Sequence, residues 1–558
     1  MSSEQKKNNS SFLIQGIILA SAGIISRLIG LAYRIPLNNI LGDEGQGFYG
    51  CAFEIYNIAL LLTSYSLPLA VSKLVSARVS KKEYKNAKKI FRGALMFALA
   101  AGSLVGGIVF IFSDFIAANL MKVELSAYAL RVLAPGLLIV AIMGVVRGFF
   151  QGMGTMVPTA FSQVLEQIVN AIVSIVGASY LVEIGKKAAE AKENSSLAPA
   201  YGAAGGTLGT VSGSLFGLLF LLVVLGMFYP KFRRKAKKDR TKNVESYSEI
   251  YKVLLLTIAP VILSTAIYNV SGILDQAIFG NVMDAQGHSA KEVAELLGMF
   301  TGKYNTMIHI PLAVANALSS SLIPSLTATV ASGTRKQVNV KINMVIRFSM
   351  VIAIPCFVGF LVMAEPVLSL LYSGNIEIPA KMLQLGAITV VFYCLSTVSN
   401  AILQGVNKMT TPVKHAAVSL GIHLIAIYFM LVICKWGIYS LVAGNIIFSL
   451  SMCILNSIAI KKATRYHQEI NKTFWIPLKA SAIMGIIAFA ANLLIGKIVP
   501  EKLTTLIAIV IAVAVYAVCL LKFGALSNSE IKALPKGRKL FHIFQKLHLV
   551  SEEETEIE

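Results

Sequence analysis

Fourteen apolar stretches run through this chain, each long enough to cross a lipid bilayer as a helix, which takes about 20 residues. Only a helix satisfies its own backbone hydrogen bonds within lipid one segment at a time. The sequence therefore predicts an all-α polytopic membrane protein. The expected spans are 12–33, 48–71, 90–113, 125–150, 157–182, 203–229, 251–279, 297–325, 342–364, 382–403, 413–434, 436–460, 474–495 and 503–521.

The distribution of basic residues predicts how these helices are oriented. The chain of 558 residues has a formal net charge of +22, which in a soluble protein would suggest nucleic acid as a partner. Only 14% of its residues are charged, however, against about 25% in soluble domains. Of its 50 Lys and Arg residues, 36 lie in the two ends and the loops of one side, and 10 lie on the other side. Because cytoplasmic loops of membrane proteins carry the excess of Lys and Arg, we expect both ends in the cytoplasm and no nucleic-acid partner.

The chain also repeats itself. Phe150-Gln151-Gly152, followed by Pro158, matches Leu403-Gln404-Gly405, followed by Pro412. The interval between the two copies covers six expected helices, an even number, so the two halves should have parallel topology. Substrate sites in transporters built this way lie between the halves, near the middle of the membrane.

This repeat divides the chain into five parts. We expect an N-terminal lobe of six helices at 1–229, a basic cytoplasmic linker at 230–250 and a C-terminal lobe of six helices at 251–460. Two further helices follow at 474–521, and a cytoplasmic tail occupies 522–558. Within the tail, the apolar spacing of 537–547 predicts a helix that lies on the membrane surface.

Arg27, within the first span, is the residue that points most directly to a function. A central arginine costs roughly 2.5–3.5 kcal/mol on insertion scales, so such residues are rare in lipid. In one explanation Arg27 pairs with Glu54, Glu166 or Asp275 and only fixes helix packing. In the other it faces a water-filled cavity and binds an anion, and its planar guanidinium suits phosphate. The sequence favours the second explanation.

Three further cations fall within or near the ends of spans. Arg34 and Lys303 lie toward the outer ends of spans one and eight, in different halves, so both charges could line one cavity. Snorkelling to the outer membrane interface is the alternative for each of them. Arg147, near the inner end of span four, is expected to snorkel.

No signature of catalysis is present in the chain. We find no nucleotide-binding Walker loop, no His-Glu-x-x-His and no Gly-x-Ser-x-Gly motif. The six cysteines lie in or at the ends of apolar spans without metal-ligand spacing and are interpreted as packing residues. We therefore expect a secondary transporter rather than an enzyme, with no metal and no cofactor.

Several features together resemble one superfamily of transporters. These are the fourteen helices, their 6+6+2 plan, the segment Ser26-Arg27-Leu28-Ile29-Gly30 followed by Tyr33-Arg34, and the two Gln-Gly motifs. They resemble the multidrug/oligosaccharidyl-lipid/polysaccharide (MOP) exporters. Within these the chain is similar to the MurJ-type lipid II flippases, in the stage V sporulation protein B-like branch of Gram-positive bacteria. The resemblance extends from about Phe12 to Leu521 and implies a V-shaped, monomeric transporter of the bacterial plasma membrane.

The resemblance also implies a site. The family has a cationic cavity with essential arginines in its first helix, to which Arg27 and Arg34 correspond, and a helix-eight arginine that falls near Lys303. Two positions depart from the family pattern: Ile35 stands where well-known members have an acid, and span two has no arginine before Lys73. The last two helices of the family form a groove for a long lipid tail, which spans thirteen and fourteen would provide here.

The expected activity is export of a polyprenyl-pyrophosphate-linked cell-wall precursor, lipid II, from the inner to the outer leaflet by alternating access. Each negative charge on the head gains about 2.3 kcal/mol per 100 mV, so the membrane potential alone can drive export, with a coupling ion as the alternative. Other hypotheses are a flippase for teichoic or capsular precursors, a multidrug exporter, and a non-transporting membrane scaffold for wall synthesis or sporulation. Cationic drugs require acidic residues in a cavity, so Arg27 argues against multidrug export.

Overall fold

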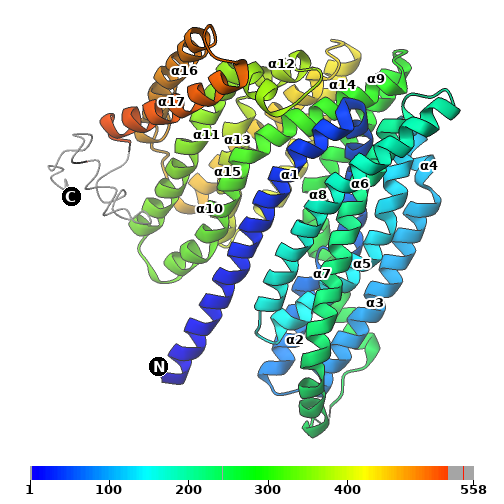
Figure 1. Ribbon diagram of the computed structural model, residues 1–558. Helices are drawn as coiled ribbons and strands as arrows, with labels where there is room; N and C mark the ends of the chain where they lie inside the picture. The colour runs from blue at the N-terminus through cyan, green and yellow to red at the C-terminus, as the bar shows by residue number, and fades with distance from the viewer. Residues whose placement is uncertain (1–2, 242, 526–544, 546–558) are drawn as a thin grey trace. The chain divides into compact units, whose positions relative to one another are not determined.

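The structure, a computed structural model, describes residues 3–241, 243–525 and 545, and all of its regular secondary structure in these ranges is helical (Figure 1). The prediction of an all-α membrane protein is confirmed, and every expected span falls on a helix. Within the described ranges, ten helices are long and apolar enough to cross a membrane, or eleven if the bent pair at 377–405 counts as one span. The number fourteen stays a prediction.

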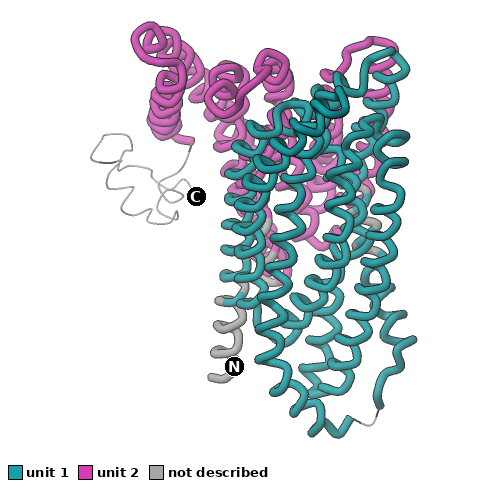
Figure 2. Tube along the Cα trace, turned by 45° about the vertical axis from the view of Figure 1, so that its right-hand side comes forward, with its two compact units in different colours: residues 1–302 teal, residues 303–558 magenta. Residues whose placement is uncertain are grey.

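The chain divides into two compact units, residues 1–302 and 303–558 (Figure 2). The first unit contains α1 (Ser3–Thr63), α2 (Leu67–Ser80), α3 (Tyr84–Ile111), α4 (Ser113–Phe115), η1 (Ile116–Leu120), α5 (Ser126–Gly152), α6 (Val157–Ala191), α7 (Leu197–Lys238), α8 (Tyr247–Ala285) and α9 (Ala290–Gly298). The short π-helix η2 (Met299–Tyr304) runs across the boundary. The second unit contains α10 (Asn305–Ser332), α11 (Arg335–Leu371), α12 (Glu377–Gly386), α13 (Thr389–Gly405), α14 (Thr411–Val432), α15 (Tyr439–Thr464), η3 (Asn471–Trp475), α16 (Ile476–Ile495) and α17 (Glu501–Lys522).

The long helix α1 consists of two helices joined at Gly42. This glycine has φ +67° and ψ 179°, a left-handed, non-helical conformation that L side chains rarely adopt. The chain can therefore leave the first expected span and enter the second without a loop. Both expected spans lie within the range that α1 and α2 cover.

A cluster of aromatic rings packs the core of the first unit at one end. Phe91 on α3 lies 4.4 Å from Phe149 on α5, centroid to centroid, and Phe149 lies 5.1 Å from Phe232 on α7. Ile250 and Leu254 at the start of α8 are buried in the same cluster. This burial explains why α8 belongs to the first compact unit. The division into lobes at 230–250 stays a prediction.

Glycines allow α6 and α7 to pack closely. Gly205, Gly209, Gly213 and Gly217 recur every fourth residue on α7 and so share one face. On α6, a Cβ added at Gly177 would lie only 2.7 Å from the carbonyl oxygen of Gly205. Small residues at this spacing bring two membrane helices into backbone contact, and the two helices run side by side in Figure 1.

The internal repeat of the sequence corresponds to a repeated helix–helix contact. In the first unit, a Cβ at Gly152 would lie 2.7 Å from Cβ of Val75 on α2. In the second unit, a Cβ at Gly405 would lie 2.9 Å from Cδ2 of Leu326 on α10. Each glycine ends its helix, and the next helix begins with a proline in its first turn. The two copies of the motif therefore make equivalent turns.

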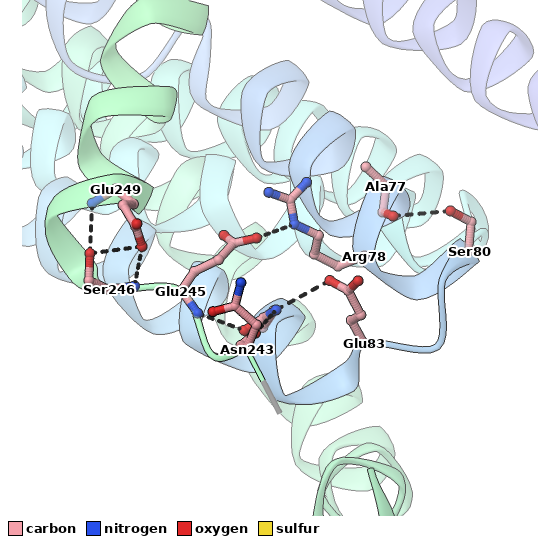
Figure 3. A network of polar contacts seen from close by, with 9 residues as sticks. Ala77, Arg78, Ser80, Glu83, Asn243, Glu245, Ser246 and Glu249 are labelled. Atoms are coloured by element: carbon pink, nitrogen blue, oxygen red, sulfur yellow. Dashed lines mark hydrogen bonds and ion pairs between the residues drawn. The ribbon is translucent and has the colours of Figure 1, made fainter. Parts of the chain in front are cut away.

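Hydrogen bonds fix the expected linker on the turn between α2 and α3 (Figure 3). Arg78 donates from Nε to Oε1 of Glu245 across 2.6 Å. Asn86, which is 2% exposed, donates to the carbonyl oxygen of Asn243 and accepts from the backbone N–H of Glu245. Ser246 then caps α8 in a reciprocal capping box with Glu249. We call this contact the linker clasp; it joins 239–246 to 78–86.

Apart from residue 545, the expected surface helix at 537–547 lies outside the described residues, as does the tail from 526 onward.

Candidate functional site

Arg27 and Arg34 lie on the same face of α1. A separation of seven residues places two side chains almost directly above one another, about 10 Å apart along a helix. Both arginines are exposed. Neither forms an ion pair within the described part of the chain, so the carboxylates that the sequence offers as partners of Arg27 do not neutralise it. Two guanidinium groups on one helix face are therefore available to an anion.

A charged cluster lies next to Arg34 within the first unit. Arg34 acts electrostatically on Glu54 and on Tyr49, and Glu54 acts in turn with Asp275 on α8. Asp275 is 5% exposed. A Cβ at Gly272, one turn before Asp275, would lie 2.6 Å from Oε2 of Glu54. The glycine thus lets the carboxylate of α1 rest against the backbone of α8, and the cluster joins the two helices.

Glu166 has a partner other than Arg27. Arg147 donates from Nη2 to Oε2 of Glu166 at 2.8 Å and from Nε to Oγ of Ser162 at 2.9 Å. The two charged side chains are only 13% and 19% exposed. The expectation that Arg147 snorkels to the interface is therefore wrong, because its guanidinium is neutralised within the bundle by the carboxylate of Glu166 on the adjacent helix. Arg147 lies near the end of α5 and Glu166 near the start of α6, and the connection between the two helices is short. This closeness in sequence is the signal that would have predicted the pair.

Lys303 is a buried anchor of a loop in the second unit. It is 1% exposed, and its Nζ donates to the carbonyl oxygens of Ser373 at 3.1 Å and Asn375 at 2.7 Å. Gly374 between these two residues has φ +81°. The ammonium group therefore holds a tight turn at the end of α11, and it is less available to a substrate than the two arginines of α1.

An apolar groove of about 440 Å³ lies between α11, α16 and α17. Gly359, Met484 and Ala508 are among the residues that line it. At its side, the hydroxyl of Tyr516 donates to the carbonyl oxygen of Val351 at 2.7 Å, which ties α17 to α11. A groove of this composition suits a hydrocarbon chain and no charged ligand.

Comparisons with known proteins are consistent with this architecture. Residues 13–330 match the profile of the family described as "Polysaccharide biosynthesis protein". The chain is 29% identical over 563 aligned positions to the lipid II flippase MurJ of Bacillus subtilis (strain 168), covering 95% of this chain and 99% of the relative. It is 23% identical to the stage V sporulation protein B of the same organism, covering 94% and 98%.

Solved structures show the same fold. A structure of the lipid II flippase MurJ in an inward closed conformation superimposes with a TM-score of 0.64 at 14% identity, covering 91% of this chain and 99% of that one. An inward-facing multidrug transporter of the MATE family, in the MOP superfamily, superimposes with a TM-score of 0.59 at 16% identity, covering 79% and 96%. The resemblance to MOP exporters is thus confirmed at the level of the fold, and the chain belongs to the family described as "Polysaccharide biosynthesis protein".

Proposed function

We propose that this protein is a flippase that exports a polyprenyl-pyrophosphate-linked saccharide, with lipid II as the favoured substrate. The observation that carries the proposal is the pair of exposed arginines, Arg27 and Arg34, on one face of a membrane helix and without an ion-pair partner in the described chain. A pyrophosphate supplies the charge that such a pair lacks. The relative at 29% identity, a lipid II flippase, supports this substrate.

In this mechanism the pyrophosphate head enters a cavity from the cytoplasmic side, and the arginines replace its hydration with charge-assisted hydrogen bonds. A planar guanidinium can donate two parallel hydrogen bonds to phosphate oxygens, which a lysine cannot. The apolar groove between α11, α16 and α17 accommodates part of the polyprenyl tail. The two lobes then rearrange so that the cavity closes to the cytoplasm and opens to the outer side, where the head leaves. Both chain ends remain in the cytoplasm.

The energy source in this proposal is the membrane potential. A head with two negative charges gains about 4–5 kcal/mol per 100 mV when it moves outward from a negative interior. The cluster of Arg34, Glu54 and Asp275 offers a second contribution, since buried carboxylates can carry a coupling cation. Varying the potential and the ion gradients separately in proteoliposomes distinguishes the two sources.

The test is lipid II export by purified protein in proteoliposomes. Arg27→Ala should lower the export rate about 10- to 100-fold, the worth of one or two charge-assisted hydrogen bonds. Arg27→Lys should restore only part of it, because the fork geometry is lost. Arg131→Ala removes a half-buried arginine bonded to Asp114 and should leave export intact. Normal export by a properly inserted Arg27→Ala protein would refute the site.

A second lipid-linked saccharide serves as the comparison for substrate identity. If the protein transports a teichoic or capsular precursor faster than lipid II, that precursor is the substrate, and the proposed binding site still holds. Transport of cationic drugs by the protein, with no export of any lipid-linked saccharide, would favour a multidrug exporter. No transport of either class would favour the scaffold.

A further inference from the structure

A second cavity, of about 710 Å³, lies at the basic end of the second unit. Three segments form it: the turn from α10 to α11, the turn from α13 to α14, and the end of α15. Each segment contributes one cation to its lining, namely Arg335, Lys408 and Lys462. All three cations are exposed at its mouth.

The electrostatics of this cavity are uniformly positive. No carboxylate lines it, and none of its three cations forms an ion pair within the described ranges. Arg335 donates from Nε to the carbonyl oxygen of Thr464 at 2.7 Å, which holds its guanidinium at the rim. Two long helices, α11 and α14, also begin beside the cavity, at Arg335 and Thr411, and helix starts carry partial positive charge. The arrangement therefore favours an anion.

The internal repeat of the chain shows that the fold does not require a cavity here. In the first unit the equivalent place lies between the start of α3, the end of α5 and the end of α7, and aromatic rings pack against one another there. Phe150 lies 5.8 Å from Phe228, and Tyr84 lies 6.3 Å from Phe232, between ring centroids. By the alignment of the two Gln-Gly motifs, Leu403 stands where the first unit has Phe150. The second unit thus has a cavity with cationic residues at the place where the first unit has packed aromatic rings.

The walls of the cavity narrow the choice of anion. Three apolar residues also line the cavity: Val338 and Leu403, which are buried, and Val330, which is exposed. A soluble phosphate would leave these walls unused, whereas a phospholipid offers both a phosphate and a glycerol–acyl region. Basic pockets between helices on the cytoplasmic side of membrane proteins bind anionic lipid headgroups. The basic loops of this chain are those that the sequence assigns to that side.

We propose that this cavity binds an anionic membrane phospholipid, with the headgroup phosphate held by Arg335, Lys408 and Lys462 and the glycerol region against the apolar walls. The site uses none of the residues of the proposed transport site, and its test does not require transport.

The test measures lipid retained by the purified full-length protein in native mass spectrometry, with phosphatidylglycerol and phosphatidylcholine offered in equal amounts. The variant R335Q/K408Q/K462Q should lose phosphatidylglycerol affinity roughly a hundredfold, at about fivefold for each cation. The matched control is K336Q/K414Q/K461Q, which removes the same charge from neighbouring positions outside this cavity and should stay within about twofold of the unmodified protein.

A second variant, Leu403→Phe, introduces at the cavity wall the ring that the first unit has at Phe150, and it does not change the charge. It should also lower phosphatidylglycerol retention, and it keeps the proposal testable if the triple variant does not fold. Equal retention by the cavity and control variants, or equal retention of the two lipids, would overturn the proposal. Displacement of phosphatidylglycerol by millimolar inorganic phosphate would assign the site to a soluble phosphate instead.

Discussion

The guanidinium of Arg147 on α5 and the carboxylate of Glu166 on α6 form an ion pair at 2.8 Å inside the first unit. Glu166, one of the three acids that the sequence offers as a partner for Arg27, is therefore paired with Arg147 instead. One buried contact thus bears on the site as well as on stability, since it keeps Glu166 occupied while the arginines of α1 remain exposed.

Breaking this ion pair should destabilise the protein. Arg147→Gln leaves the Glu166 carboxylate without its ion-pair partner at a mostly buried position, so the free energy of unfolding should fall by about 3–5 kcal/mol. The double variant R147Q/E166Q should recover a large part of the loss, because no uncompensated charge remains. Unfolding followed by circular dichroism in detergent measures both values. The exposed pair Lys186–Glu183 is the control, and its loss should cost less than about 1 kcal/mol.

The linker clasp should depend on Asn86. Its side chain bonds to the backbone of Asn243 and of Glu245, so Asn86→Ala removes hydrogen bonds worth about 1 kcal/mol each. We expect faster tryptic cleavage after Arg240 and faster amide exchange across 243–250. Ser80→Ala, which alters an exposed hydroxyl on the same turn, should change neither rate. Unchanged cleavage in Asn86→Ala would mean that apolar packing alone holds the linker.

The clasp should also respond to acid through Asp239. Burial would raise the pKa of this carboxyl, but hydrogen bonds from the backbone N–H of Lys85 and from Thr241 outweigh it and lower the pKa. Because the pKa is lowered in the folded state, the carboxylate stabilises the clasp fully at any pH above its ordinary pKa of about 3.9. This stabilisation is lost as the pH falls through the folded-state pKa. Hydrogen exchange at Lys85 and Thr241 should therefore accelerate only below about pH 4. In Asp239→Asn this acid-dependent step should disappear.

Lys303 should contribute to the stability of the fold and not to substrate binding. Lys303→Met leaves the carbonyl oxygens of Ser373 and Asn375 without their charged donor, at a cost of about 1.5–3 kcal/mol per hydrogen bond. The thermal midpoint should fall, while the correctly folded fraction, assayed below that midpoint, should still export substrate. A protein of normal stability that has lost export would instead place Lys303 in the substrate site.

Filling the apolar groove should impair transport of long-chain substrates. Gly359 lines the groove, and a Cβ added there has no atom within 4 Å, so Gly359→Phe places a ring in the groove without a clash at its Cβ. Export of a substrate with a full polyprenyl tail should fall, and export of a short-chain analogue should not. Gly421→Phe is the matched control, since Gly421 also has open space around its Cβ but does not line the groove. Equal effects of the two variants would remove the groove from the proposed mechanism.

The sequence was a good guide to the helices and to the repeat. The Gln-Gly motifs at Gly152 and Gly405 predict equivalent turns, and the structure has them, because a glycine under a crossing helix and a proline that starts the next one are local requirements. The boundary between the two compact units, after residue 302, could not be predicted from the same signals. The side chains of Ile250 and Leu254 are apolar whether they face lipid or a neighbouring bundle, so their sequence does not reveal which surface they join.

Hydropathy and charge bias by themselves determined that this is an all-helical membrane protein of repeated design with a few costly cations, since both the bilayer and the basic loops act on each segment separately. Which cations have partners was decided only by tertiary structure. Arg147 pairs with Glu166, and Lys303 donates to two backbone carbonyl oxygens. Arg27 has no ion-pair partner among the described residues. The physical reason is that an ion pair depends on the approach of two helices to within a few ångströms, and that distance is set by the packing of residues such as the glycines of α7.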